Sequence, residues 1–255
     1  QGLVDHADSL GATARFGEGD TQWMTAGSGV QHSEMFPLTR TDRDNPLEMF
    51  QTWLNLPASD KMVDAYFTML WSDQTPRHTA TDAAGNTAEI TVIAGSLGDH
   101  QGPTPPPNSW ASKPEADVAI WHIRLAPNAR WTLPRATGAE TMRMLYAFEG
   151  SDVRIGDHEP IEAGTGAQLR ADVDVELVAG ADGIDCMLLQ GRPIAEPVAR
   201  YGPFVMNTED EIQEAFADYR STQFGGWPWP SPMPHHGVES ERFAIHADGR
   251  REDVS

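Results

Sequence analysis

The sequence predicts an all-β protein of two tandem jelly-roll β-barrels, followed by a short helix and a Pro-rich tail. The chain has 23 Gly and 19 Pro, scattered between short apolar runs, as is typical of antiparallel β-proteins. Each half also repeats a pattern of apolar strand, Gly-bearing turn and apolar strand, which two barrels in tandem would explain. The length of 255 residues is sufficient for two such domains.

Short apolar runs predict the strands one by one. In the first half we expect strands at residues 22–26, 30–36, 50–56, 66–71 and 89–94. Residues 98–107 are rich in Gly and Pro and predict a linker, because Pro has no N–H to donate to a β-ladder. In the second half we expect strands at residues 118–125, 130–133, 141–148, 152–155, 167–170, 175–178 and 186–189. The predicted domains are therefore a first barrel, a second barrel and a C-terminal helix with tail, at residues 1–102, 103–200 and 201–255.

One helix is predicted near the end of the chain. Thr208 and Glu211 have the spacing of a capping box, in which each side chain bonds the backbone N–H of the other residue. Ile212, Phe216 and Tyr219 then recur at helical spacing and give one apolar face. Because this face is apolar, we expect the helix to pack on a barrel. The tail that follows is too rich in Pro for regular structure.

Charge and composition exclude several classes of function. The net charge is −20, with Lys and Arg far outnumbered by Asp and Glu, so we expect no direct binding to nucleic acid or to an anionic membrane. No apolar run approaches the roughly 18 residues of a membrane span. The single cysteine, Cys186, cannot form an internal disulfide, which predicts the cytoplasm as the compartment. The chain starts without Met, and we expect it to be a trimmed product or a fragment.

The segment at residues 19–34 contains the chemistry. It predicts a turn, a strand, a tight turn at Gly27 and Gly29, and a second strand, arranged as a hairpin. On the second strand His32 and Glu34 are two residues apart, so both side chains project from the same face. An imidazole and a carboxylate on one face of a strand are half of a first-row metal site. On a solvent-facing strand, the same pair would be only a polar edge.

Several blocks of the chain together resemble a known family. They are His-x-Asp-Ser-Leu-Gly at residues 6–11, Gly-Asp-x-Gln-Trp-Met-Thr-Ala-Gly-x-Gly at 19–29, His-Ser-Glu-Met at 32–35, Trp-x-Asn-Leu-Pro at 53–57 and Gly-Pro-Phe-Val-Met-Asn-Thr at 202–208. In this order, over nearly the whole chain, the blocks resemble the pirin family of the cupin superfamily. The resemblance implies two cupin (jelly-roll) barrels, with Fe(II) in the first held by three His and one Glu.

Residue by residue, the resemblance assigns His32 and Glu34 as metal ligands. Two further His, on a His-x-His strand, are expected upstream of Gln1 and are absent here. Either the chain has lost its N-terminal strands, or it is a true truncation that binds metal weakly. His6 is the nearby histidine that would have to substitute, although the family uses its block as a turn and strand edge. We predict no ligand role for His78, His100, His122, His158, His235, His236 and His246, and the second barrel lacks a metal motif.

The resemblance also implies two functions, and a third remains open. In the first, the protein is a dioxygenase of the quercetin 2,3-dioxygenase type that cleaves a flavonol-like substrate on Fe(II) or another divalent first-row metal. Glu34 would then accept the substrate proton, and Trp23, Met24 and Gln51 are candidates to line the pocket. The alternative is a non-catalytic, iron-dependent redox sensor that binds a protein partner. A metal-free structural protein is the third interpretation.

Overall fold

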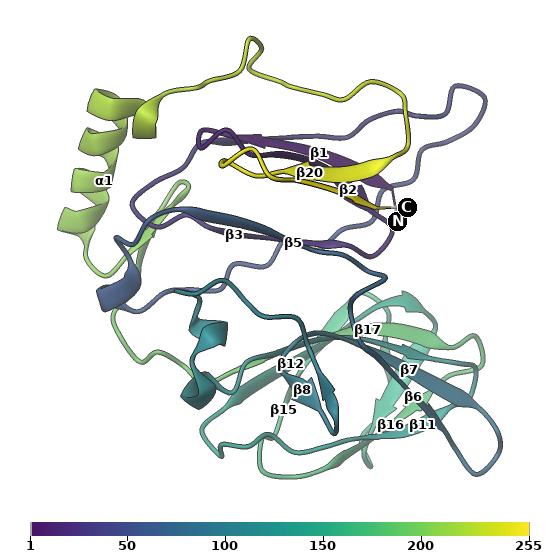
Figure 1. The fold of residues 1–255 in the computed structure, drawn as a ribbon. Helices are drawn as coiled ribbons and strands as arrows, with labels where there is room; N and C mark the ends of the chain where they lie inside the picture. Colours follow the sequence, from purple (N-terminus) through teal and green to yellow (C-terminus); the bar gives the residue numbers. More distant parts are fainter. Residues whose placement is uncertain (1, 255) are drawn as a thin grey trace. The chain divides into compact units, whose positions relative to one another are not determined.

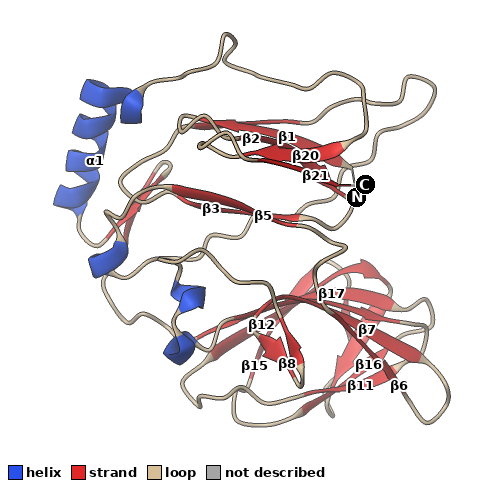
Figure 2. Cartoon of the chain, viewed as in Figure 1, coloured by secondary structure: helices blue, strands red, loops and turns tan. Residues whose placement is uncertain are grey.

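The computed structural model describes residues 2–254, and strands make up most of the regular structure in this range (Figure 2). The single α-helix among these residues is α1 (Glu209–Thr222). The prediction of an all-β chain with one short helix near its C-terminus is confirmed. No helix among the described residues has both the length and the hydrophobicity that crossing a bilayer requires.

The described chain divides into two compact units. The first unit holds the residues up to Asp73, together with Pro106–Ser109 and the residues from Ala195 onward. The second unit holds Gln74–Pro105 and Trp110–Ile194. This division differs from the predicted segments, because β7 (Thr87–Ala94) pairs with β10 (Ala119–Leu125) in the second unit. The predicted domain bounds, residues 1–102, 103–200 and 201–255, stay a prediction.

The first unit contains two β-layers around a small core. One layer is a five-stranded sheet and the other is an antiparallel pair of strands (Figure 1). Buried residues of both layers form one cluster, which includes Val4 and Phe16 from the sheet and Phe67 and Met69 from the pair. In order across the sheet the strands are β21 (Arg251–Val254), β20 (Arg242–Ile245), β2 (Thr13–Gly17), β1 (Leu3–Asp8) and β4 (His32–Met35), and the pair is β3 (Thr21–Thr25) with β5 (Tyr66–Leu70).

The predicted hairpin between residues 22 and 36 is wrong. Gly27 and Gly29 do adopt positive φ angles, 52° and 129°, but β3 pairs with β5 whereas β4 pairs with β1. The turn therefore carries the chain from one layer to the other. Gly27 is required there, because an added Cβ would lie 2.1 Å from the carbonyl oxygen of Val63.

The strand predicted at residues 50–56 is also absent. This segment forms neither helix nor strand, and Phe50 and Trp53 on it are 44% and 56% exposed. A strand is stabilised by burying one face against a layer, whereas these two aromatic side chains stay largely exposed. Strands β1 and β2, which contribute two of the five strands of the sheet, were not predicted as strands.

The second unit is a two-sheet barrel with the larger core. Its two larger sheets have six and four strands, all antiparallel, and their buried side chains form one apolar cluster. A short third sheet pairs β8 (Ser96–Leu97) with β9 (His100–Gln101). The larger sheet runs β15 (Thr165–Leu169), β12 (Met142–Gly150), β17 (Ile184–Gly191), β10, β7 and β6 (Arg77–Thr81). The smaller sheet runs β11 (Arg130–Leu133), β16 (Val175–Ala179), β13 (Asp152–Ile155) and β14 (Ile161–Glu162).

Helix α1 starts at the predicted capping box. The Thr208 hydroxyl accepts a hydrogen bond from the backbone N–H of Glu211, and the Glu211 carboxylate accepts one from the backbone N–H of Thr208. On the apolar face, the ring of Phe216 meets Phe204 edge-on, with 4.8 Å between the centroids. The chain just after the helix places Phe224 where any Cβ on Gly29 would lie, so the helix ends beside the β3–β4 turn.

Candidate metal centre

Pairing of β1 with β4 brings four polar side chains onto one face. In the antiparallel register His6 lies opposite Glu34, and Asp8 lies opposite His32. Directly opposed residues project to the same side of a sheet, as do residues two apart on one strand. The two strands therefore present a square of two imidazoles and two carboxylates.

Three of these residues have the spacing of a metal site. One ligand atom from each of His6, His32 and Glu34 lies within 4.8 Å of the other two. Nδ1 of His32 is 4.0 Å from Oε1 of Glu34, and the rings of His6 and His32 have centroids 5.7 Å apart. Bonds of about 2.0–2.2 Å join such donors to a first-row metal, so small side-chain rotations would bring all three to one ion.

His6 is the deepest member of the group. It is 0% exposed, and its ring stacks on Phe67 of β5 at a centroid distance of 5.2 Å. Nε2 of His6 is 3.2 Å from Oδ2 of Asp8, whereas Nδ1 has no hydrogen-bond partner among the described residues. Oδ1 of Asp8 accepts hydrogen bonds from the backbone N–H groups of Leu10 and Ala12, which fixes the carboxylate.

His32 and Glu34 lie at the outer side of the group, with side chains 35% and 20% exposed. Burial lowers the pKa of His32, and the neighbouring Glu34 carboxylate only partly opposes that effect. A lowered pKa favours the neutral imidazole, which is the form that binds metals. Nε2 of Gln51 donates a hydrogen bond to Oε2 of Glu34 at 3.3 Å, so one residue expected near the site contacts it.

Trp23 and Met24, the other two expected lining residues, project from opposite faces of strand β3 in the second layer. Met24 lies directly opposite Phe67 in the β3–β5 pair, whereas Trp23 lies opposite Thr68. Because Phe67 faces His6, Met24 shares the face turned toward the site and Trp23 projects from the other face. Of these two expected lining residues, Met24 alone therefore shares a face with Phe67.

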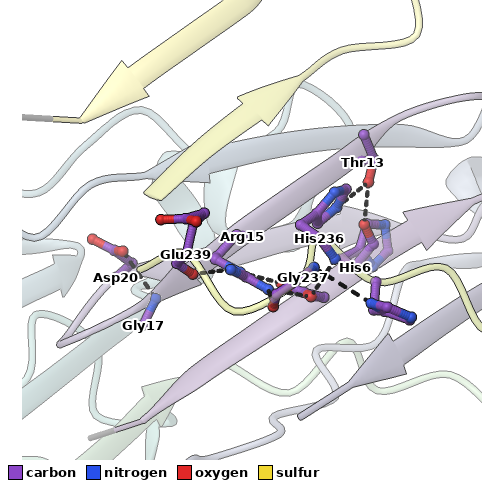
Figure 3. Close-up of polar contacts among 10 residues, drawn as sticks. His6, Thr13, Arg15, Gly17, Asp20, His236, Gly237 and Glu239 are labelled. Atoms are coloured by element: carbon purple, nitrogen blue, oxygen red, sulfur yellow. Dashed lines mark hydrogen bonds and ion pairs between the residues drawn. The ribbon is translucent and has the colours of Figure 1, made fainter. Parts of the chain in front are cut away.

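A buried polar network holds the strand that carries His6. Asp5 and Arg15, opposite each other on β1 and β2, form a two-point ion pair with distances of 2.6 and 2.7 Å. The C-terminal segment 229–239 covers this pair. Arg15 donates to the carbonyl oxygens of Gly237 and Glu239 (Figure 3). The backbone N–H of His236 donates to Asp5. Near the end of β1, Nε1 of Trp229 donates to the Asp8 carbonyl oxygen.

Two of the other histidines have acidic partners of their own. His122 pairs with Asp185 at 2.9 Å, and His246 pairs with Glu252 at 2.8 Å. The sequence predicted that His32 and Glu34 share one face, and the structure places them together. It did not predict that His6 would lie beside them, although the i, i+2 spacing of His6 and Asp8 was a signal for a shared face.

The donor set fits a divalent first-row metal. Imidazole nitrogen and carboxylate oxygen both suit Fe, Mn, Co, Ni and Zn. Nδ1 of His6 is a buried ring nitrogen without a hydrogen-bond partner among residues 2–254. Such nitrogens are rare in folded proteins, and a metal ion bound there would satisfy this one.

Comparison with known proteins identifies the family. The Pirin family model matches residues 1–54, and the model of the pirin C-terminal cupin domain matches residues 120–225. A Pseudomonas aeruginosa protein provisionally named as a quercetin 2,3-dioxygenase is 36% identical over 224 residues, covering 88% of this chain and 73% of its own length. Human pirin is 32% identical, covering 88% of this chain and 72% of pirin.

A solved structure is similar to this chain in both fold and sequence. The crystal structure of quercetin 2,3-dioxygenase from Acinetobacter baumannii matches with a TM-score of 0.76 at 32% identity, covering 89% of this chain and 74% of that one. The predicted pair of cupin domains is confirmed by the family models and this likeness together. With relatives above 30% identity matched over more than two thirds of their length, the chain belongs to the pirin family of the cupin superfamily.

Proposed function

We propose that this protein is a metal-dependent dioxygenase that acts on a flavonol-like aromatic substrate, with His32 and Glu34 as metal ligands. The observation that carries the proposal is the placement of these two side chains on β4, 4.0 Å apart and beside a second imidazole. The names of the Pseudomonas and Acinetobacter relatives support the reaction class. Fe(II) is the proposed metal, and other divalent first-row metals suit the same donors.

The protein's own residues supply binding and proton transfer. When bound, the metal would be a Lewis acid and a template for the substrate and O₂. Glu34 is partly exposed, so its carboxylate is accessible to a substrate hydroxyl and would accept the proton that the hydroxyl loses. The Gln51 amide, which donates to Oε2 of Glu34, would orient that carboxylate. Phe67, buried against His6, would keep water from the inner side of the site.

A quercetin assay tests the proposal. The protein would be loaded anaerobically with Fe(II), mixed with quercetin and O₂, and followed by loss of the visible absorption of quercetin and by release of carbon monoxide. We expect turnover by the wild type and none by Glu34→Gln, because the amide neither accepts the proton nor binds the metal as a carboxylate does.

Glu214→Gln is the matched control, since it makes the same Glu-to-Gln change at an exposed position on helix α1. It should retain the wild-type rate. Absence of turnover by the metal-loaded wild type, or an unchanged rate in Glu34→Gln, would contradict the proposal.

A regulatory function is the second candidate. In it the same metal site would act as a redox sensor, and the protein would bind a partner instead of turning over a substrate. Exposed apolar side chains in the loop after β4 favour a partner surface, among them Leu38 at 70% exposure and Trp53 at 56%. One metal per chain without quercetin turnover, combined with redox-dependent capture of a partner, would favour this function.

The compartment and the absence of nucleic-acid binding stay predictions. They depend on the single cysteine and on the net charge of −20. A gel-shift assay with duplex DNA at low salt would contradict the second prediction if a complex formed.

A further inference from the structure

We propose that His6 is a ligand of this metal site through Nδ1, and that Asp8 positions it. The inference rests on the proposed metal site and extends it from two donors on one strand to three donors on two strands. Neither the family models nor the likeness to known proteins assigns this role to His6.

The hydrogen bond to Asp8 decides which nitrogen of His6 is free. A carboxylate only accepts hydrogen bonds, so Nε2 of His6, at 3.2 Å from Oδ2 of Asp8, carries the proton. In the neutral ring Nδ1 then has a lone pair and no proton. This nitrogen is buried and has no hydrogen-bond partner among the described residues. A metal ion would satisfy it with no change of tautomer.

Asp8 is held in place to serve as this partner. Its other oxygen, Oδ1, accepts two backbone N–H bonds at 2.9 and 3.0 Å, so the carboxylate cannot rotate away without breaking the turn after β1. A carboxylate that accepts the second N–H of a ligand imidazole is a common support of metal sites, because it fixes both the ring orientation and the tautomer.

The surroundings of His6 also restrict its ring. Phe67 stacks on it from the second layer, and Oγ1 of Thr13 donates to the His6 carbonyl oxygen. The same Thr13 hydroxyl lies 2.9 Å from Nε2 of His236 on the C-terminal segment. A ring fixed on both its face and its backbone is preorganised for a ligand, since little conformational entropy is lost when the metal binds.

The resulting set of three donors suits an Fe(II) oxygenase. His6, His32 and Glu34 are two imidazoles and one carboxylate, the combination that non-haem Fe(II) oxygenases use while leaving coordination positions open. The three residues come from paired strands at opposed or diagonal positions, with His6 directly opposite Glu34. This chain therefore has its own three-ligand set among the described residues.

Nitrogen NMR on the wild-type protein tests the ligand directly, without any substitution. Zn²⁺ would be titrated into protein with ¹⁵N-labelled histidines, and the ring nitrogens would be followed by long-range ¹H–¹⁵N correlation. We expect Nδ1 of His6 to move to the position of a metal-bound nitrogen while Nε2 stays protonated. His246, whose Nε2 pairs with Glu252, is the internal control and should not move.

Co²⁺ binding by calorimetry and by visible absorption gives the second readout. We expect His6→Gln to weaken Co²⁺ binding by at least about 100-fold and to change the absorption bands, since removal of supporting groups alone costs about 10–100-fold. His246→Gln is the matched control, because His246 is also a buried imidazole that packs on Phe67, at 5.6 Å. It should bind Co²⁺ like the wild type.

Asp8→Asn tests the positioning role. The Asn carbonyl oxygen can still accept the two backbone N–H bonds, but its amide would offer a donor to Nε2 of His6 and force the proton onto Nδ1. We expect affinity for Co²⁺ to fall by about 10–100-fold with the fold intact, and the NMR spectrum to show the changed tautomer.

The outcomes separate the two proposals. If the wild type binds no Co²⁺ or Zn²⁺ at one per chain, the metal site itself is wrong. If it binds metal and only His32 shifts, or if His6→Gln binds with unchanged affinity and absorption, the metal site stands and the role of His6 is overturned. Should His6→Gln fail to fold, the NMR result on the wild type decides.

Discussion

At the residue scale, the buried Asp5–Arg15 ion pair is the interaction whose loss should cost most stability. Both side chains are at most 1% exposed, so removing one charge leaves the other buried without compensation. We expect Asp5→Asn to lower the free energy of unfolding by about 3–5 kcal/mol. Urea unfolding followed by circular dichroism would measure it.

An exposed Arg–Asp pair provides the control for that prediction. Arg251 and Asp253, two residues apart on β21, approach to 2.6 Å but are 51% and 66% exposed. Water and salt screen such a pair, so Asp253→Asn should leave the urea midpoint unchanged within error. Equal losses in the two variants would show that burial does not distinguish these pairs.

Burial should also make the Cys186 thiol unreactive. Removal from water raises the pKa of its thiol to about 12, and the nearby Asp185 charge adds to the shift. A thiol reagent should therefore label native protein at pH 8 far more slowly than protein in urea. The thiol has a higher pKa in the folded state than its value of about 8.5 in the unfolded chain. Its contribution to folding stability is therefore fully present below pH about 8.5 and is lost as the pH rises from there toward 12. Fast labelling of the native protein would contradict the prediction.

At the scale of single elements, the start of α1 depends on its capping box. Thr208→Ala removes the hydroxyl that accepts the Glu211 N–H, and we expect a loss of about 1 kcal/mol in unfolding free energy. Gln213→Ala, at an exposed position one residue beyond Ile212, is the control and should cost little or nothing. Thermal unfolding of both variants would compare them, and equal midpoints would argue against the cap.

Element boundaries and element pairing were not equally predictable. The α1 helix and β4 were predicted correctly because capping residues and side-chain alternation act within one segment. The pairing of β4 with β1 instead of β3 could not be predicted, since a Gly-rich turn permits either a hairpin or a crossing to the next layer. The segment at residues 50–56 shows the same limit. Its apolar residues suit a strand, but a strand needs a neighbour.

At the scale of the whole molecule, the net charge of −20 should make stability depend on salt. Like charges repel more strongly in the compact state than in the unfolded chain. Raising NaCl from about 0.01 to about 0.15 M shortens the screening length from roughly 30 to 8 Å. We therefore expect the melting temperature to rise with NaCl. A scan at constant pH without metal would measure it, and a fall in melting temperature would mean that favourable ion pairs outweigh the repulsion.

By itself the sequence determined the all-β class, the capped helix and the His32–Glu34 pair, because each follows from spacing within a few residues. The family followed from motifs whose order needs no coordinates. Only the tertiary structure decided that His6 lies opposite Glu34 and that the C-terminal segment covers Asp5 and Arg15. These contacts join residues distant in the chain, and strand register, which local sequence does not encode, fixes which of them meet.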